Sequence, residues 1–426
     1  ELATLEIKAI TKLKALHEEL CFCRAFPADV EMLQLADGGL ASFGGRVRAL
    51  GKRARAGLAD TGMAQTELYF EYTYDIACVL ADLFPNDVRI DWRGFENEEP
   101  LHALLAVIGF KAEEQTFDDG LASAQDWIER AKGDSDVTDY AWLVRQCRAD
   151  PALRTLAPHL FDAAQIPVVW TLRGPRASRT LNHISTRQRP RDVDQPVRRS
   201  SKPAQDILAP LPKCRPLPPD RAAEVIASAQ LALAMRHREV YATTHANVYE
   251  VYLVPVGRGV EIAMIGVEPS RRLGIEANYG YFMYSHGVPV GYGGVSPLFA
   301  QANTGVNVFE EYRGGDSAMM FTQTLRVAHA LFGTSRFVVN AYQFGGDNAE
   351  ALASGALWFY YKLGFRPMDR DIRRIAAKEF QRLRTKKGSR TSSSVLKQLA
   401  HGDLELVLRK GDVGPWSLPI SMRVAA

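Results

Sequence analysis

The spacing of apolar residues divides this chain into two parts with different expected structure. In the first 165 residues or so, apolar side chains recur at helical intervals, as at Leu5, Ile10, Leu13 and Leu20. The pattern predicts helices at Ala64–Phe84, Pro100–Phe110, Asp118–Lys132, Thr138–Cys147 and Pro151–Ala164. A short β-like run, Ile166–Leu172, closes this part. We find no repeat of fixed period, so a solenoid is not predicted.

After Pro219 the pattern changes to short apolar runs of the kind that form strands. A helix is predicted first, over Asp220–His237, and a hairpin turn at His286-Gly287 places His286 at the surface. The predicted strands are Val248–Val256, Val260–Val267, Tyr279–Ser285, Val288–Val295, Thr304–Phe309, Arg336–Tyr342 and Leu404–Leu408, and the later helices are Ser317–Phe332 and Asn348–Lys362. Strands followed by alternating strands and helices indicate a mixed sheet with helices packed on it.

Between these parts lies a basic, proline-rich stretch that is poor in large apolar residues. We expect a linker or a long exposed loop there. The predicted fold is therefore α/β. An all-helical domain (residues 1–172) is joined by the linker (173–218) to a domain with a mixed sheet (219–426).

Composition limits the classes of protein. A length of 426 residues favours two or three domains, and a net charge of only +3 excludes a polycation, so nucleic-acid binding would need a local basic patch. The five cysteines are sparse and lack a zinc-finger spacing, which favours a reducing, cytoplasmic location and no metal. Neither a membrane-spanning run nor a secretory signal is expected in the sequence shown.

The segment Val306–Ala318 is the strongest candidate for a binding site. A short strand ends in Glu310-Glu311-Tyr312, and Arg313-Gly314-Gly315 then precedes a helix. Glycines at such a turn let backbone N–H groups converge, and the helix N-terminus adds its positive dipole end, which suits a pyrophosphate. The alternative is that the glycines form only a turn and that Asp316 only caps the helix.

In the order of its motifs this region resembles the GNAT superfamily of acyltransferases. The pyrophosphate loop of that family matches Val308, Tyr312, Arg313, Gly314 and Ala318, although Asp316 stands where the family usually has glycine. A second block matches at Val339-Asn340, Ala356, Tyr360 and Gly364-Phe365. The resemblance covers residues 280–367 well and residues 220–410 loosely, whereas the first half matches no family.

The resemblance implies transfer of an acyl group from a thioester, with acyl-CoA as co-substrate, to a small-molecule or peptide amine. It implies that backbone amides at Val308 and Phe309 orient the donor carbonyl, and that Tyr360 protonates the leaving thiolate. The phosphates would lie against Arg313, Gly314, Gly315, Asp316, Ser317 and Ala318. Ala353 occupies the position of the family's helix asparagine, so Asn348, further back, is the substitute candidate.

Several of these residues have a second interpretation. Glu310 is placed to act as the base for the amine, or it belongs to a solvated acidic corner. Tyr360 acts as an acid, or it packs in the core. The charge of Asp316 would repel a pyrophosphate, so this side chain turns outward, or the donor differs, or the site is inactive.

Two rival functions stay open. The basic segment Asp371–Lys387 would suit phosphates on RNA, which favours an aminoacyl-tRNA-dependent transferase with tRNA as partner, or it is a solvated amphipathic helix. The other rival is a non-catalytic binding module on the same fold.

Overall fold

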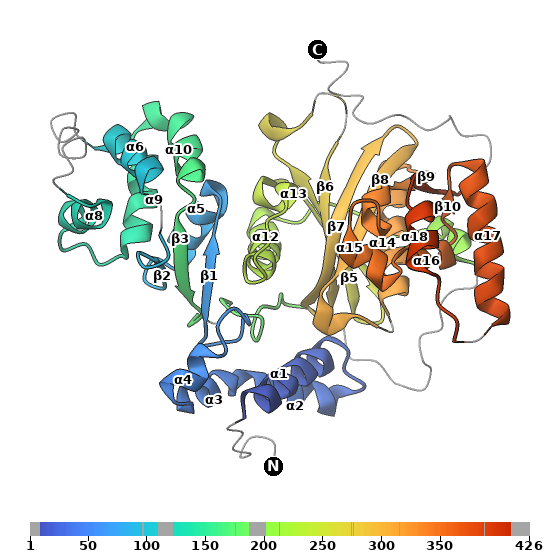
Figure 1. Cartoon of the computed structure of the whole chain (residues 1–426), viewed down its shortest axis with the longest axis horizontal. Coiled ribbons are helices and arrows are strands. Elements are labelled where there is room, and N and C mark those ends of the chain that lie inside the picture. Colours follow the sequence, from blue (N-terminus) through green and yellow to red (C-terminus); the bar gives the residue numbers. More distant parts are fainter. Residues whose placement is uncertain are drawn as a thin grey trace. The chain divides into compact units, whose positions relative to one another are not determined.

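The computed structural model describes residues 9–95, 98–109, 122–174, 176–186, 202–212, 214–273, 275, 277–314, 316–386 and 388–409. The chain forms two compact units that alternate along the sequence. Unit 1 comprises Glu1–Arg24, Glu31–His183 and Ala227–Val240, and unit 2 comprises Ala25–Val30, Ile184–Ile226 and Tyr241–Ala426. Figure 1 colours the chain from its N-terminus to its C-terminus.

Unit 1 combines helices with a small antiparallel sheet. Its helices are α1 (Ile10–Ala25), α2 (Val30–Ala41), α3 (Phe43–Ala49), α4 (Lys52–Ala56), α5 (Tyr74–Leu83), α6 (Glu99–Ile108), α8 (Ala124–Lys132), α9 (Asp139–Ala149), the 3₁₀ turn η2 (Pro151–Leu153) and α10 (Leu156–Ala164). The sheet has the order β1-β3-β2, from β1 (Glu67–Glu71), β2 (Val88–Ile90) and β3 (Pro167–Thr171). The α/β class is confirmed, but the prediction of an all-helical first domain is wrong.

The error lies in the segment Ala64–Phe84, which the sequence pattern predicted to be one helix. The structure divides it into β1 and α5. Strand β1 pairs with β3 in a register that joins Leu68 to Trp170, and both side chains are fully buried. A pairing partner about a hundred residues away leaves no trace in local periodicity, so the pattern favoured the helix that follows.

The core of unit 1 surrounds this sheet and includes Tyr140, Phe161 and Trp170. Two thiols belong to the same core, Cys78 on α5 and Cys147 on α9. Burial raises the pKa of Cys78 to about 11 and that of Cys147 to about 12. Both thiols are therefore protonated in the folded state well above the pH at which an exposed thiol ionises.

We expect unit 1 to lose stability as the pH rises above about 9. These thiols have a higher pKa in the folded protein than in the unfolded chain. Their contribution to stability is therefore complete at pH values below the unfolded-state pKa, and it is lost as the pH rises towards the folded-state pKa. In that range each such thiol lowers the free energy of unfolding by at most about 1.4 kcal/mol for each unit of pH increase. Urea unfolding at several pH values should give a shallower decline for Cys147→Ala than for the wild type. Cys214→Ala, which removes an only partly buried thiol, should change the slope less, and equal slopes for all three proteins would contradict this account.

Unit 2 contains one eight-stranded sheet with the order β10-β11-β9-β8-β7-β6-β5-β4. The strands are β4 (Ala246–Gly257), β5 (Val260–Val267), β6 (Tyr279–Ser285), β7 (Val288–Leu298), β8 (Gln301–Val308), β9 (Arg336–Val339), β10 (Arg366–Pro367) and β11 (Leu404–Val407). Neighbouring strands are antiparallel except β8 and β9, which are parallel. The predicted mixed sheet is thus confirmed.

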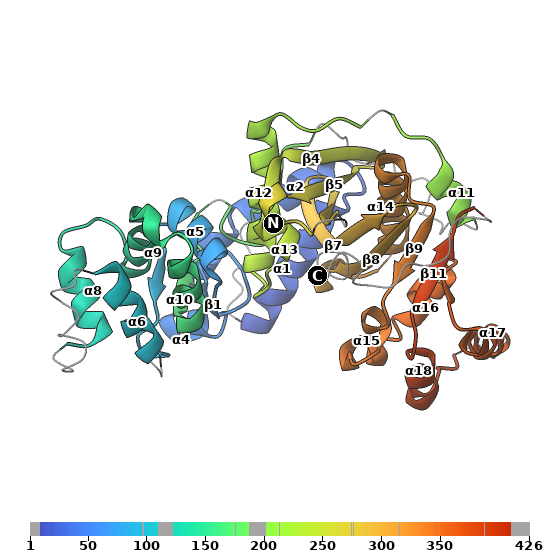
Figure 2. The same ribbon diagram turned by 90° about the horizontal axis from the view of Figure 1, so that it is seen from above.

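Helices cover both faces of this sheet, as Figures 1 and 2 show. The helices that belong to unit 2 in whole or in part are α11 (Pro203–Leu208), α12 (Pro219–Ala234), α13 (Tyr241–Thr244), α14 (Ser317–Phe332), α15 (Ala349–Ser354), α16 (Leu357–Lys362), α17 (Arg370–Thr385) and α18 (Ser393–Leu399), with 3₁₀ turns η3 (Pro269–Arg271), η4 (Glu310–Tyr312) and η5 (Ala341–Phe344). The residues of α12 from Ala227 onward belong to unit 1. Alternate residues of β6 face opposite layers. Tyr279 contacts Phe332 of α14, whereas Tyr284 donates to the carbonyl of Val225 in α12.

The hairpin between β6 and β7 turns at His286-Gly287, as predicted, with positive φ at both residues. The prediction that His286 lies at the surface is wrong, because its side chain is only 3% exposed. Its Nδ1 lies 3.0 Å from the carbonyl oxygen of Ala25, and the amide of Ile184 donates to the carbonyl of Gly287. Segments distant in sequence therefore cover the turn.

Two other segments differ from their sequence expectations. The helix predicted over Asn348–Lys362 is divided into α15 and α16 by Gly355, which has a φ of +66°. Part of the predicted basic linker, residues 203–210, packs on α14, where Arg326 donates to the carbonyls of Ala209 and Pro210. In the part of the chain that the structure describes, no helix is long and apolar enough to cross a membrane.

Candidate functional site

The parallel strands β8 and β9 separate partway along their length. Their pairing joins Gln301–Asn303 to Arg336–Val338 and extends no further among the described residues. Strand β8 nevertheless continues to Val308 and stays paired with β7 on its other edge. We call residues Gly305–Val308 the open edge of β8, because the N–H groups of Val306 and Val308 face the β9 side beyond the last residues that pair with β9.

Tyr360 of α16 provides one such partner. The amide of Val306 donates to its phenol oxygen over 3.3 Å. The ring is 2% exposed and is surrounded by Phe321, Phe344 and Phe365. Burial raises the pKa of Tyr360 well above its ordinary value, against the opposing effect of the Val306 bond. The phenol is therefore protonated at neutral pH, and among the described residues its own hydrogen has no acceptor.

Val308 lies two residues further along the same edge, about 6.6 Å away at the usual strand rise. The register of β7 and β8 is regular here, so the amide of Val308 faces the same side as that of Val306. The Val308 carbonyl on this side accepts from Nε of Arg313 over 3.4 Å. The amide of Phe309 faces the other way and donates to the carbonyl of Val290. Of the two amides predicted to orient a donor carbonyl, only that of Val308 faces the open edge.

The predicted pyrophosphate loop connects β8 to α14. It contains the turn η4 and then Gly314, whose φ of +138° favours glycine. Gly315 lies outside the described residues. Asp316 occupies the N-cap position of α14, but its side chain makes no capping hydrogen bond, so the expectation that it merely caps the helix is wrong. Instead, the amide and hydroxyl of Ser317 both donate to the carbonyl of Gly314.

The remaining predicted site residues have local structural contacts. Arg313 pairs with Glu350 over 3.2 Å at the surface. The Asn348 side chain caps α15 by accepting from the amide of Ala351 over 3.0 Å. Glu310 is exposed at the start of η4, and no described contact joins it to Tyr360. Ala318, in the first turn of α14, is buried. The structure therefore brings together Tyr360 and the open edge but leaves Glu310 without a demonstrated place in the site.

Sequence reasoning missed two side chains that support the open edge. The phenol of Tyr281 on β6 crosses over Gly293 of β7 and donates to the carbonyl of Gly305 over 2.5 Å. Gln343 of η5 lies against Gly305, where a Cβ atom would be 2.6 Å from its side-chain oxygen. Glycine inside a strand often marks such a close approach, so Gly293 and Gly305 were the sequence features that could have indicated these two contacts.

Within the described ranges, no group of three or more His, Cys, Asp or Glu side chains is arranged to hold a metal ion. Searches of protein-family models, curated proteins and solved structures found no match to this chain.

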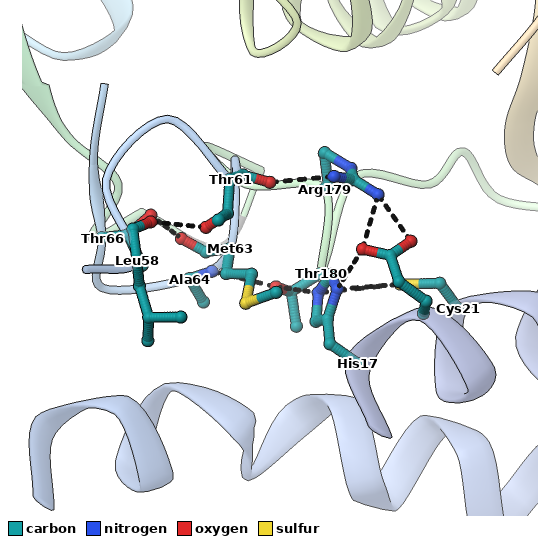
Figure 3. Close-up of polar contacts among 10 residues, drawn as sticks. His17, Cys21, Leu58, Thr61, Met63, Ala64, Thr66, Arg179 and Thr180 are labelled. Carbon is teal, nitrogen blue, oxygen red and sulfur yellow. Dashed lines mark hydrogen bonds and ion pairs between the residues drawn. The ribbon is translucent and has the colours of Figure 1, made fainter. Parts of the chain in front are cut away.

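A second group of polar side chains lies in unit 1 (Figure 3). Nε2 of His17 is 2.9 Å from the hydroxyl of Thr180, which also accepts from the amide of Ala64. The Cys21 sulfur lies 3.7 Å from the same nitrogen. A Cys–His pair can form a nucleophile, but Cys21 is only 2% exposed and His17 is fully buried. Together with the ion pair of Arg179 and Glu18, the group joins α1 to two distant segments of unit 1.

Replacing Thr180 with valine is expected to destabilise unit 1 by about 2 kcal/mol, because the buried Ala64 amide and Nε2 of His17 each lose a hydrogen bond at nearly constant shape. Chemical denaturation monitored by circular dichroism measures this change. The matched substitution Thr61→Val removes a single bond to the carbonyl of Leu58 within one turn and should cost less. Equal, small effects of both substitutions would show that the group does not stabilise the unit.

Proposed function

We propose that unit 2 carries a GNAT-like acyltransferase domain that moves an acyl group from acyl-CoA to an amine. The observation that carries the proposal is the position of the Tyr360 phenol at the open edge of β8, on the same side as the amide of Val308. The motif resemblance supports it independently, because Val308, Arg313 and Tyr360 are among the residues that match the family. A reducing, cytoplasmic location belongs to the same proposal and fits the five free cysteines.

In the proposed reaction, the carbonyl oxygen of the thioester accepts a hydrogen bond from the amide of Val308. This bond strengthens as negative charge develops on the oxygen during attack by the amine. The amine nitrogen forms the new bond to carbon, and the carbon–sulfur bond breaks. The departing thiolate receives the proton of the Tyr360 phenol, and the attacking amine releases a proton to Glu310 or to water. Solvent then restores the phenol.

The phosphates of the donor would lie at the first turn of α14. The first amides of a helix have no acceptor within it, and Ser317 already uses its own amide on the carbonyl of Gly314. The amides of Ala318 and Met319, with the helix dipole, are the donors that suit a pyrophosphate. The carboxylate of Asp316 stands at the same helix end, so its charge opposes phosphate binding if the two share a side.

A thermal-shift screen of acyl-CoAs against the wild type and Asp316→Gly tests the donor. At about 100 times the dissociation constant, a bound donor stabilises the folded protein by about 2.7 kcal/mol, which gives a clear rise in Tm. A larger shift for Asp316→Gly would show that the carboxylate opposes the phosphates. Equal shifts would show that it faces away. The absence of a shift for both proteins would rule out acyl-CoA as the donor.

A further inference from the structure

Helix α17 presents a line of basic side chains to solvent. We call Arg370, Arg374, Lys378 and Arg384 the basic stripe. These side chains are all exposed, and their spacing places them within about a third of the helix circumference. Arg370 and Arg384 are 14 residues apart, so the stripe extends for about 21 Å at 1.5 Å per residue.

The opposite face of α17 is already occupied. Phe380 packs on Trp358 and Tyr361 of α16, with ring centroids 5.7 and 4.8 Å apart, and Ala376 is fully buried. Helix α17 also contacts the edge strand β10, and it lies at the outer edge of the unit 2 sheet in Figure 2. The helix is therefore held in one orientation, and its apolar side is not available to enter a lipid layer.

Nearby acidic side chains do not cancel the charge of the stripe. Glu379 is held by Arg382, and Glu405 is shared by Arg336 and Arg373, none of which belongs to the stripe. Asp371 pairs with Arg374 over 3.5 Å, but both side chains are more than 80% exposed, so the pair contributes little. The stripe thus keeps most of its positive charge.

We propose that the basic stripe binds the phosphate backbone of a nucleic acid. Three of its four members are arginines, whose planar guanidinium groups bind phosphate with two parallel hydrogen bonds. Arg370, Arg374 and Lys378 follow one another about one helical turn apart, and Arg384 lies six residues beyond Lys378. These members can contact phosphates along a strand. The stripe contains no aromatic side chain on which a base could stack, so binding should depend on charge and be nearly independent of sequence. The proposal depends on α17 alone and does not require acyl transfer.

Fluorescence anisotropy with the full chain tests the proposal. The probes are a labelled single-stranded RNA of about 20 nucleotides and a labelled duplex DNA of the same length. The salt concentration is about 50 mM, because phosphate contacts are strong at low salt. The wild type should bind at least one of these probes, with affinity that falls steeply as salt increases. The variant with Arg370→Gln, Arg374→Gln, Lys378→Gln and Arg384→Gln should bind at least tenfold more weakly. For single strands its salt slope should be smaller by about 0.7 for each lost contact.

The control variant carries Arg48→Gln, Lys52→Gln, Arg53→Gln and Arg55→Gln, which removes the same charge from exposed positions in unit 1. It should keep most of the wild-type affinity. Failure of the wild type to bind either probe, an equal loss in both variants, or unchanged binding by the α17 variant would overturn the proposal. Binding of vesicles containing anionic phospholipids in preference to either nucleic acid would overturn it as well. An unchanged circular dichroism spectrum and Tm would establish that both variants are folded.

Discussion

Tyr360→Phe is expected to lower the turnover number of acyl transfer by about 10²- to 10⁴-fold, the usual contribution of a positioned proton donor. Because the phenol donates to the thiolate only as that thiolate forms, the dissociation constant of the donor should change little. The substitution also removes the acceptor of the Val306 amide, which should cost only about 1 kcal/mol of stability. Steady-state kinetics, donor binding and thermal unfolding of the same preparation separate these three effects.

Tyr361→Phe is the matched control. Tyr361 follows Tyr360 on α16 and is equally buried, but its ring packs on Phe380 of α17. The Tyr361→Phe variant should therefore keep the turnover number of the wild type. A turnover number for Tyr360→Phe within about threefold of the wild type, at equal stability, would show that Tyr360 only packs in the core.

Gly293→Ala is expected to destabilise unit 2 by more than about 3 kcal/mol, which is enough to lower the yield of folded protein strongly. A Cβ atom at this position would overlap the carbonyl oxygen of Gly305 and the phenol of Tyr281. Neither group can move easily, because β8 is fixed by pairing with β7 and the Tyr281 ring is fully buried. Urea denaturation and the soluble yield measure the effect.

The neighbouring glycine offers a sharp control. At Gly294 the nearest atom to an added Cβ is the carbonyl oxygen of Tyr279 at 3.8 Å, an ordinary contact. Gly294→Ala should therefore be tolerated and, by restricting the unfolded chain, should stabilise the protein by a few tenths of a kcal/mol. Similar stability of the two variants would contradict the packing of Tyr281 across Gly293 to the open edge.

The second half of the chain was the easier part to predict. The bounds of β5, β6 and α14 agree with the sequence expectation at both ends. Each forms one continuous apolar or amphipathic run that ends at a clear turn or helix stop, such as His286-Gly287 or Gly333. In the first half, β1 was missed because its partner β3 is distant in sequence, and an adjacent helix dominated the local pattern.

The candidate site was predicted only in part. The motif order indicated Val308 and Tyr360, and the structure places the phenol beside the open edge that Val308 ends. The orientation of the Phe309 amide depends on strand pairing and could not be inferred from residue types. The burial of His286 depends on Ala25, a residue about 260 positions earlier in the chain. Contacts of this kind are set by the tertiary structure and leave no local sequence signal.

We propose that the open edge of β8 and the first turn of α14 form a site for an acyl-CoA donor. Equilibrium dialysis of the full chain against radiolabelled acetyl-CoA and a longer-chain acyl-CoA tests it most directly. We predict saturable binding of one equivalent, with a dissociation constant below about 1 mM, as expected for a substrate at cellular levels. Unlabelled CoA should compete for the site. No saturable uptake of either donor by folded protein up to that concentration would contradict the claim.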